Sequence, residues 1–195
     1  CWGIEAYGTE EQKEKYLPKL TSGEWIGSFC LSEPEAGSDA TSQRTTAVDM
    51  GDHYVLNGTK NWITNGGSSS LHLVIAQTNP ELGHKGINAL IVEADQKGVV
   101  IGAKEDKLGI RSSDTHTIMY NDVIVPKSNR IGEDGFGFKF AMKTLSGGRI
   151  GIAAQALGIL GGSYELSAAY AMEREAFGKP IIKHQAIGFK LAEMA

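Results

Sequence analysis

Cysteine is scarce in this chain of 195 residues, which has only Cys1 and Cys30. Two cysteines are too few for a disulfide framework, and neither a CxxC motif nor a Cys/His spacing typical of a metal site is present. The five histidines lie at positions 53, 72, 84, 116 and 184, and no two of them are three or four residues apart. We therefore expect free thiols in a reducing compartment and no metal site.

The chain also lacks an excess of charge of one sign and a long hydrophobic run. It has 19 Lys and Arg against 23 Asp and Glu, which gives a formal net charge of −4. Because a nucleic-acid partner requires a basic surface, we expect no such partner. The most apolar run, residues 150–162, contains Gln155 and is shorter than the ~20 residues that span a membrane. The sequence therefore predicts no membrane insertion.

What the chain does contain is typical of a globular protein, because 41% of its residues are hydrophobic, enough for the core of one large domain or two small ones. Residues 10–20 predict a short helix, since Thr9 is a suitable N-cap and Gln12 occupies the capping-box position. Short apolar or alternating runs predict strands at 71–75, 88–92, 98–101 and 115–125. Turn residues separate them at 79–80, 84–86 and 121–122, and the whole pattern indicates an antiparallel β domain.

Helical periodicity returns after residue 137. We expect one helix from Phe138 to about Glu175 and a second from near Lys183. An interior glycine costs a helix up to ~1 kcal/mol relative to Ala, so the glycines of the first helix need a reason. They lie at positions 147, 148, 151, 158, 161 and 162. Close packing of another helix and a ligand that passes over this surface are the two alternatives.

The first of two polar clusters, residues 32–39, is suited to bind an anion. It combines serines, a helix-breaking Pro and a Gly that is free to take positive φ. Its backbone N–H groups around Ala36, Gly37 and Ser38 can form a nest for a negatively charged group. The alternative is an ordinary Ser/Gly loop.

The second cluster, residues 62–64, presents a flat aromatic surface. Trp62 and Thr64 are two residues apart, so on a strand both point to one face, which would suit a flat ring system. Taken alone, a Trp is more often a core aromatic. Between the clusters, Asn57-Gly58 is the strongest short-range hairpin signal and predicts that both clusters belong to one small sheet.

Five stretches of the sequence resemble the acyl-CoA dehydrogenase family, and within it the short-chain (butyryl-CoA) type: CLSEPEAGSDATS, NGTKNWITN, KEDKLGIR, LSGGRIGIAAQALGI and REAFGKPI. The likeness covers the whole chain, and the first and last stretches are specific to the family. It implies an α+β fold, in which an antiparallel β-barrel-like middle domain is followed by the first helices of an up-down helical bundle. The implied division is 1–24 for the end of an N-terminal helical domain, 25–135 for the middle domain and 136–195 for the start of the bundle.

The same resemblance implies that the chain is a fragment. Members of the family are longer, with an all-helical N-terminal domain before this segment and most of a bundle after it. Here the chain begins at Cys1 without a Met and stops within a helical pattern at Ala195. We expect the N-terminal domain and the rest of the bundle to be absent.

FAD is the cofactor that the resemblance implies. Ser32 would bond to the pyrimidine side and Ser38 would lie near the pyrophosphate and the acyl-CoA. Trp62 would pack beside the isoalloxazine, with the Thr64 hydroxyl near N5. Donors at the pyrimidine edge would stabilise the negative charge that arrives with a hydride. The implied flavin-lining residues of the two clusters are Phe29, Cys30, Leu31, Ser32, Glu33, Pro34, Glu35, Ala36, Gly37, Ser38, Trp62, Ile63 and Thr64.

The remaining implied contacts lie near the C-terminus. Three residues, Arg174, Phe177 and Gln185, match positions that reach across a subunit interface to the flavin of the neighbouring subunit, which implies a homo-oligomer, expected to be a tetramer. The alternative interpretation of these three residues is that they form a solvated helix end. The acyl-CoA would be met by Ser38, Ser146, Gly147, Gly148 and Arg149. For Arg149 the alternative is a structural ion pair.

A catalytic base is not expected within the chain. The family removes an α-proton of the thioester with a Glu, which in the long-chain and isovaleryl types stands immediately before the invariant Arg. Gly148 occupies that position here. In the short- and medium-chain types the Glu lies downstream, so it is expected beyond Ala195. We interpret Glu165, Glu173 and Glu175 as surface carboxylates.

The implied reaction is the α,β-dehydrogenation of a short acyl-CoA to the trans-2-enoyl-CoA, with electrons passed to an electron-transferring flavoprotein. An acyl-CoA oxidase of the same fold and a catalytically idle binding or assembly subunit are the alternatives. The expected location is the cytoplasm of a bacterium, or the mitochondrial matrix in a eukaryote. The acyl chain length and the electron acceptor are left open by the sequence.

Overall fold

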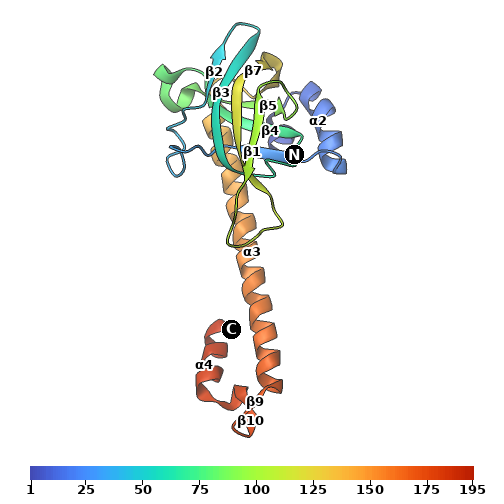
Figure 1. The fold of residues 1–195 in the computed structure, drawn as a ribbon, viewed down its shortest axis with the longest axis vertical. Coiled ribbons are helices and arrows are strands. Elements are labelled where there is room, and N and C mark those ends of the chain that lie inside the picture. The colour runs from blue at the N-terminus through green and yellow to red at the C-terminus, as the bar shows by residue number, and fades with distance from the viewer. The chain divides into compact units, whose positions relative to one another are not determined.

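The computed structural model describes residues 1–195, which divide into two compact units, 1–144 and 145–195. The first unit is a β-sheet with two short helices beside it (Figure 1). Its elements are α1 (Trp2–Tyr7), α2 (Glu10–Ser22), β1 (Gly27–Cys30), β2 (Thr46–Asp49), β3 (His53–Thr64), β4 (Leu71–Gln77), β5 (Ile87–Glu93), β6 (Val99–Lys104), β7 (Thr115–Pro126), β8 (Arg130–Ile131) and the 3-10 helices Pro80–Gly86 and Lys127–Asn129. The α+β class is therefore confirmed.

The sheet is open and mixed, which corrects the expected antiparallel, barrel-like domain. Its strand order is β6-β7-β3-β2-β4-β5-β8, and β1 pairs with β4 in parallel, from Gly27 opposite Leu71 to Cys30 opposite Val74. The chain crosses over through β2 and β3 between β1 and β4, and a long crossover permits parallel pairing. The sequence pattern did not indicate β1 and β2, because each has only four residues.

Asn57-Gly58 is not a hairpin turn, so that prediction was wrong. The 12 residues of β3 run straight through it, and the register with β7 shifts between Leu56 and Gly58. Gly58 has φ +148° and approaches Thr45 so closely that a Cβ would collide with it. The Asn57 side chain bonds to Asp122 of β7. Asp122 has φ +50°, and it lies within the strand and not in the turn that was expected at 121–122. Turn-forming residues here build a β-bulge, which needs the same unusual backbone angles.

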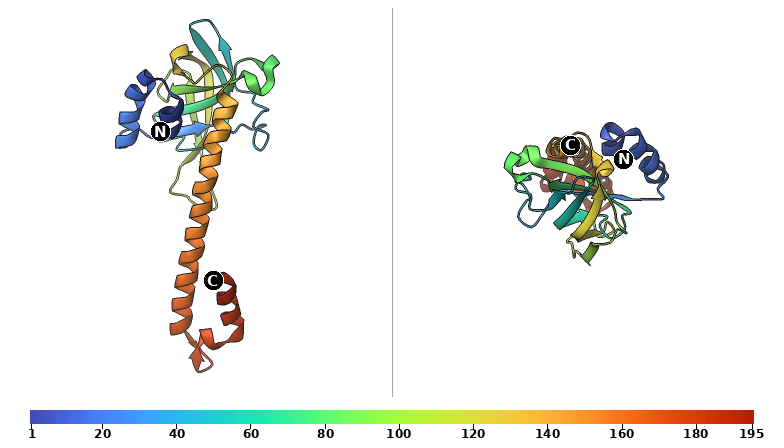
Figure 2. Two further views of the ribbon diagram at one scale, coloured as in Figure 1. Left: turned by 180° about the vertical axis from the view of Figure 1, so that it is seen from behind. Right: turned by 90° about the horizontal axis from the view of Figure 1, so that it is seen from above.

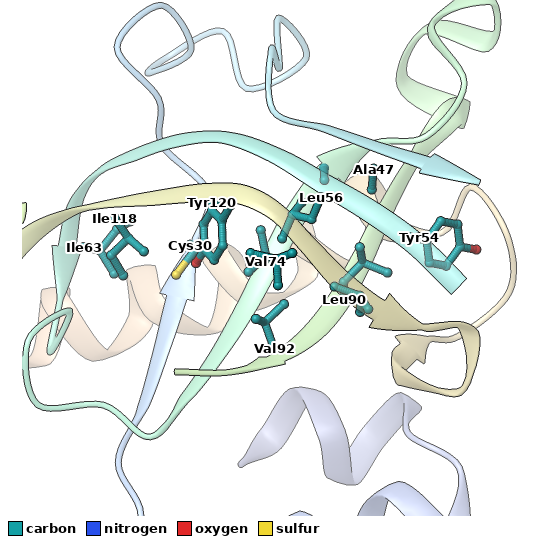
Figure 3. Packing of buried hydrophobic residues seen from close by; sticks show 13 residues of the cluster. Cys30, Ala47, Tyr54, Leu56, Ile63, Val74, Leu90, Val92, Ile118 and Tyr120 are labelled. Atoms are coloured by element: carbon teal, nitrogen blue, oxygen red, sulfur yellow. The ribbon is translucent and has the colours of Figure 1, made fainter. Parts of the chain in front are cut away.

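The sheet of the first unit carries a cluster of buried hydrophobic side chains. Leu56, Val74, Leu90 and Tyr120 are buried there, and the sulfur of Cys30 lies beside the Tyr120 ring (Figure 3). Burial raises the pKa of the Cys30 thiol to about 12. Both cysteines are free, as expected, but only Cys1 is exposed.

Three side chains of helix α2 bond to the sheet or its flanking turn: Lys15 and Tyr16 contact Glu93 of β5, and Gln12 bonds to backbone carbonyls. Gln12 Nε2 donates to the carbonyls of Ser128 (2.6 Å) and Arg130 (2.9 Å). The predicted capping box is confirmed: Gln12 N donates to Thr9 Oγ1 (3.3 Å), and Thr9 N donates to Gln12 Oε1 (3.1 Å). Figure 2 shows α2 beside the sheet from two further directions. The box therefore also fixes Gln12, one of the residues that hold the helix in place.

Replacing Thr9 by Ala should lower the free energy of unfolding by about 1 kcal/mol, because it removes the N-cap acceptor. Urea denaturation of the full-length protein measures this change. Thr21→Ala is the matched control, since the Thr21 hydroxyl is exposed and donates only to carbonyls of its own helix. Equal losses for both variants would contradict a specific role of the cap.

The second unit consists of helices joined by a small hairpin. It contains most of α3 (Gly137–Glu173), then β9 (Glu175–Ala176), β10 (Lys179–Pro180), a 3-10 helix (Ile181–Lys183) and α4 (Gln185–Met194). Both predicted helices are present, and α4 begins two residues late because the 3-10 turn precedes it. None of the helices combines the length and apolar character needed to traverse a bilayer.

Candidate functional site

The loop that follows β1 forms a tight turn with its tip exposed. Glu33 N donates to the Ala36 carbonyl (3.0 Å), and Ala36 N donates back to the Glu33 carbonyl (3.2 Å). The Ala36 amide is therefore occupied and cannot join the expected nest. Gly37 and Ser38 are exposed, their amides make no hydrogen bond within the chain, and a Cβ on Gly37 would meet nothing within 4 Å. These two amides are available to an anionic ligand.

The predicted loop residues divide into outward and inward side chains. Pro34 and Glu35 are exposed with Gly37 and Ser38, and Phe29 and Ser32 are half-buried. The inward side chains are Cys30, Leu31, Glu33 and Ala36. These four can face a ligand only through their backbone, a distinction that the sequence could not make.

Trp62 projects into solvent from β3, between the buried Lys60 and Ile63. Its side chain is 64% exposed, its φ is +61°, and the register of β3 with β7 shifts between Lys60 and Ile63. A bulge of this kind re-aims a side chain, and positive φ at a bulky residue costs of order 1–3 kcal/mol. The local backbone is thus strained in a way that displays an indole.

Thr64 shares the exposed side of β3 with Trp62, and Ile63 between them is buried in the core. The Thr64 carbonyl accepts from Ser28 Oγ (3.0 Å), which ties the end of β3 to β1. Asp114 holds the following turn by accepting from Gly67 N and Ser68 Oγ, each at 2.9 Å. The hydroxyl of Thr64 is left for other contacts.

The loop and the strand are joined directly. Asn61 N donates to the Ser32 carbonyl (2.9 Å), and the buried Lys60 Nζ donates to the Leu31 carbonyl (3.0 Å). The two polar clusters therefore lie side by side, through contacts other than the expected hairpin. Lys60 was missed in the sequence, although it continues the inward alternation of Tyr54 and Leu56, and a lysine at such a position signals a buried partner.

That partner is Glu33. Lys60 Nζ lies 2.7 Å from Glu33 Oε1, and the two side chains are 0% and 1% exposed. Burial by itself would raise the pKa of the Glu33 carboxyl, but Lys60 and the amides of Arg44 and Thr45 hold it below its ordinary value. Burial lowers the pKa of the Lys60 ammonium, and the Glu33 charge opposes that shift. Lys60 and Glu33 therefore form a buried ion pair.

These residues fit a flavin dinucleotide. The exposed indole offers a surface for a flat ring, Ser32 and Thr64 offer polar groups next to it, and the unengaged amides of Gly37 and Ser38 suit a phosphate. No group of His, Cys, Asp or Glu side chains is arranged to hold a metal ion.

The predicted substrate residues of the second unit lie on α3. Ser146, Gly147, Gly148 and Arg149 are all exposed in this chain. Arg149 Nη1 donates to Ser146 Oγ (3.4 Å), and Arg149 forms no ion pair within the chain. A Cβ added to either glycine would meet nothing within 4 Å, so space is available over this surface. Glu165, Glu173 and Glu175 are exposed, as expected.

The hairpin of the second unit displays Phe177. It stands with Gly178 between the paired residues Ala176 and Lys179, and φ is positive at both central positions, +53° and +73°. This is a type I′ turn, which rarely admits a Phe. Phe177 is 94% exposed, and its ring centroid lies 5.9 Å from that of His184. A strained, exposed aromatic is typical of a contact site.

The other two predicted interface residues flank this hairpin. Arg174 directly follows α3, where its carbonyl accepts from Ile181 N (2.8 Å), and its exposed guanidinium makes no hydrogen bond or ion pair within the chain. Gln185 is the exposed first residue of α4. All three side chains thus lie on neighbouring elements of one unit and are accessible.

Comparison with known proteins identifies the family. The acyl-CoA dehydrogenase N-terminal, middle and C-terminal domains match residues 1–24, 28–123 and 135–195. A short-chain specific acyl-CoA dehydrogenase of Clostridium acetobutylicum is 51% identical over 98% of this chain and 50% of its own length. The chain spans about half the length of the curated relatives it matches.

Solved structures give the same result. The butyryl-CoA dehydrogenase of Megasphaera elsdenii has a TM-score of 0.95 and 49% identity, over 98% of this chain and 50% of that one. A chain from a structure described as the electron transferring flavoprotein of Acidaminococcus fermentans has a TM-score of 0.94 and 48% identity, over 98% and 50%. With matches along almost its whole length, this chain belongs to the acyl-CoA dehydrogenase family.

Proposed function

We propose that the full-length protein is a short-chain acyl-CoA dehydrogenase, which converts a short acyl-CoA to the trans-2-enoyl-CoA and passes the electrons to an electron-transferring flavoprotein. The observation that carries the proposal is the strained, exposed Trp62, one residue after Asn61, whose amide bonds to the Ser32 carbonyl. About 50% identity to short-chain specific relatives supports the substrate class. The match to the flavoprotein structure supports the acceptor.

FAD is the proposed cofactor. When bound, it supplies the acceptor for the hydride that leaves the β-carbon. Trp62 packs against the ring system and excludes water from one side of it. Ser32 and Thr64 donate hydrogen bonds at its polar edges, and Gly37 and Ser38 hold the diphosphate through their amides. Phe29 and the backbone from Cys30 to Ala36 complete the wall.

The acyl-CoA is proposed to meet Ser38 and the segment Ser146–Arg149. The glycines admit the thioester limb close to the helix backbone, and the Arg149 charge orients the catalytic carboxylate. That Glu is proposed to lie beyond Ala195, since Gly148 stands where the other lineage has it. We also propose the division 1–24, 25–135 and 136–195, a homotetramer, and a location in the bacterial cytoplasm or mitochondrial matrix.

An anaerobic titration of the full-length protein with butyryl-CoA tests the proposal. Bleaching of the oxidised flavin band is the expected result, and slow reoxidation in air should follow. Rapid reoxidation would indicate an oxidase of the same fold. A flavin spectrum that no short acyl-CoA changes would refute the substrate class, and a protein that binds no flavin would refute the site.

Replacing Thr64 by Ala should slow flavin reduction about tenfold, because one hydrogen bond that strengthens as charge develops is lost. Binding of butyryl-CoA should change less than about twofold, since the hydroxyl acts on the developing charge rather than on the bound thioester. Stopped-flow absorbance measures both quantities, and Thr64→Ser is the control that keeps the hydroxyl. Equal losses in reduction and binding would mean that Thr64 only packs.

A further inference from the structure

The Lys60 ammonium has three acceptors, one for each of its protons. They are the Leu31 carbonyl (3.0 Å), Glu33 Oε1 (2.7 Å) and Gln43 Oε1 (2.5 Å). Lys60 itself is fully buried, and Gln43 is 8% exposed. No donor of the ammonium is left for any other partner.

The Glu33 carboxylate is equally committed. Besides Lys60, it accepts from Arg44 N (2.6 Å) and from Thr45 N (3.1 Å). These two amides stand at the far end of the loop from Glu33. One ion pair therefore fixes both ends of the segment 31–45. The exposed tip of this segment, with Gly37 and Ser38, lies between the two fixed ends.

The same cluster reaches the displayed indole. Lys60 stands two residues before Trp62, at the start of the bulge in β3, and Asn61 between them bonds to Ser32. A buried ion pair is weak evidence for stability, because apolar residues of similar volume would often serve as well. Its connections are what distinguish it: the three contacts of Lys60 join loop 31–45 to the start of the bulge, and the contacts of Glu33 with Arg44 N and Thr45 N join the two ends of the loop.

We propose that Lys60, Glu33 and Gln43 form a positioning cluster that holds loop 31–45 and the Trp62 bulge in their ligand-binding arrangement before FAD binds. The inference rests on the proposed flavin function. None of the three side chains touches the cofactor in this proposal. Their effect is to fix the amides and the indole that do, so that binding does not have to order them.

The test compares the double variant Lys60→Met/Glu33→Gln with the wild-type protein. Removing both charges avoids a lone buried charge, and the amide oxygen of the substituted side chain at position 33 can still accept from the amides of Arg44 and Thr45. In the full-length apoprotein, amide hydrogen exchange in segment 34–45 should be at least about tenfold faster, because Lys60 no longer holds the loop to β3 through Leu31, residue 33 and Gln43. The dissociation constant of FAD, measured by fluorescence, should rise at least about tenfold, while exchange in β4 and β5 stays within about twofold.

A matched control removes a different ion pair of the same sheet. Lys127 Nζ lies 2.6 Å from Asp49 Oδ2, away from the loop, so Lys127→Met/Asp49→Asn should change neither loop exchange nor FAD affinity. If the Lys60/Glu33 variant is merely less stable, with unchanged FAD affinity and loop exchange, the positioning role is refuted.

The two proposals fail in different ways. A wild-type protein that binds FAD and is reduced by butyryl-CoA, next to a double variant with the same FAD affinity, refutes only the positioning cluster. A wild-type protein without flavin refutes both.

Discussion

Replacing Arg174 by Met should weaken FAD binding to the full-length protein about 10- to 100-fold, which is the loss expected for charge-assisted hydrogen bonds to a diphosphate. The guanidinium is exposed and has no partner in the chain, so its removal leaves no buried group unsatisfied. Because the proposed contact crosses to a neighbouring subunit, the dissociation constant of the oligomer should also rise, so that the variant oligomer falls apart at protein concentrations at which the wild-type oligomer is intact. Fluorescence titration with FAD and sedimentation velocity measure the two effects.

Two variants show whether the effect is specific. Arg174→Lys keeps the charge but loses the planar fork, and should give an intermediate loss of affinity. Lys179→Met removes a positive charge from the same hairpin and should leave the affinity within about threefold. An Arg174→Met protein with full FAD occupancy and an unchanged oligomer would refute the shared site. Loss of FAD without any change in association would place the contact within one subunit.

The order of local elements could be predicted from the sequence, since it depends on short-range signals. The capping box of Thr9 and Gln12 and the helix pattern after residue 137 are such signals, and both are confirmed. The parallel pairing of β1 with β4 depends on contacts between residues more than 40 positions apart. No periodicity in a four-residue strand can indicate such a partner.

Asn57-Gly58 and Asp122 illustrate a second limit. Residues that tolerate positive φ are equally suited to a turn and to a bulge, and only the length of the paired strands decides between them. Here β3 and β7 each continue for 12 residues, so the bulge is formed.

For the site, the residue types indicated which segments matter but not how each side chain is oriented. Trp62 and Gly37 are exposed, in agreement with a ligand-facing role, whereas Glu33 points inward. An acidic residue in a polar loop is ordinarily solvated, and only the neighbouring lysine in three dimensions reverses that expectation. Lys60 was therefore the residue most easily overlooked.

The protein should lose about 3 kcal/mol of stability between pH 6.5 and pH 4 through His72, about 2 kcal/mol of it by pH 5. The His72 side chain is fully buried on β4, and burial lowers its pKa to about 4. Its Nδ1 contacts Tyr120 OH at 3.1 Å, and its Nε2 has no partner. Below pH 6.5 the unfolded chain binds a proton that the folded chain does not bind, so acid favours unfolding.

His72→Leu isolates this contribution, because the variant cannot bind the proton in either state. The free energy of unfolding is obtained from urea denaturation at about pH 7.5 and pH 5, at equal protein and saturating FAD concentrations. Its difference between the two pH values should be smaller in the variant by about 2 kcal/mol. The Tyr120 hydroxyl, which contacts His72, does not titrate in this window, since burial raises its pKa. The exposed carboxyls Asp39, Asp49 and Asp52 have lowered pKa values and therefore titrate below it. An equal pH dependence in both proteins would mean that His72 accepts its proton while folded, and that a buried water or a structural change accommodates the charge.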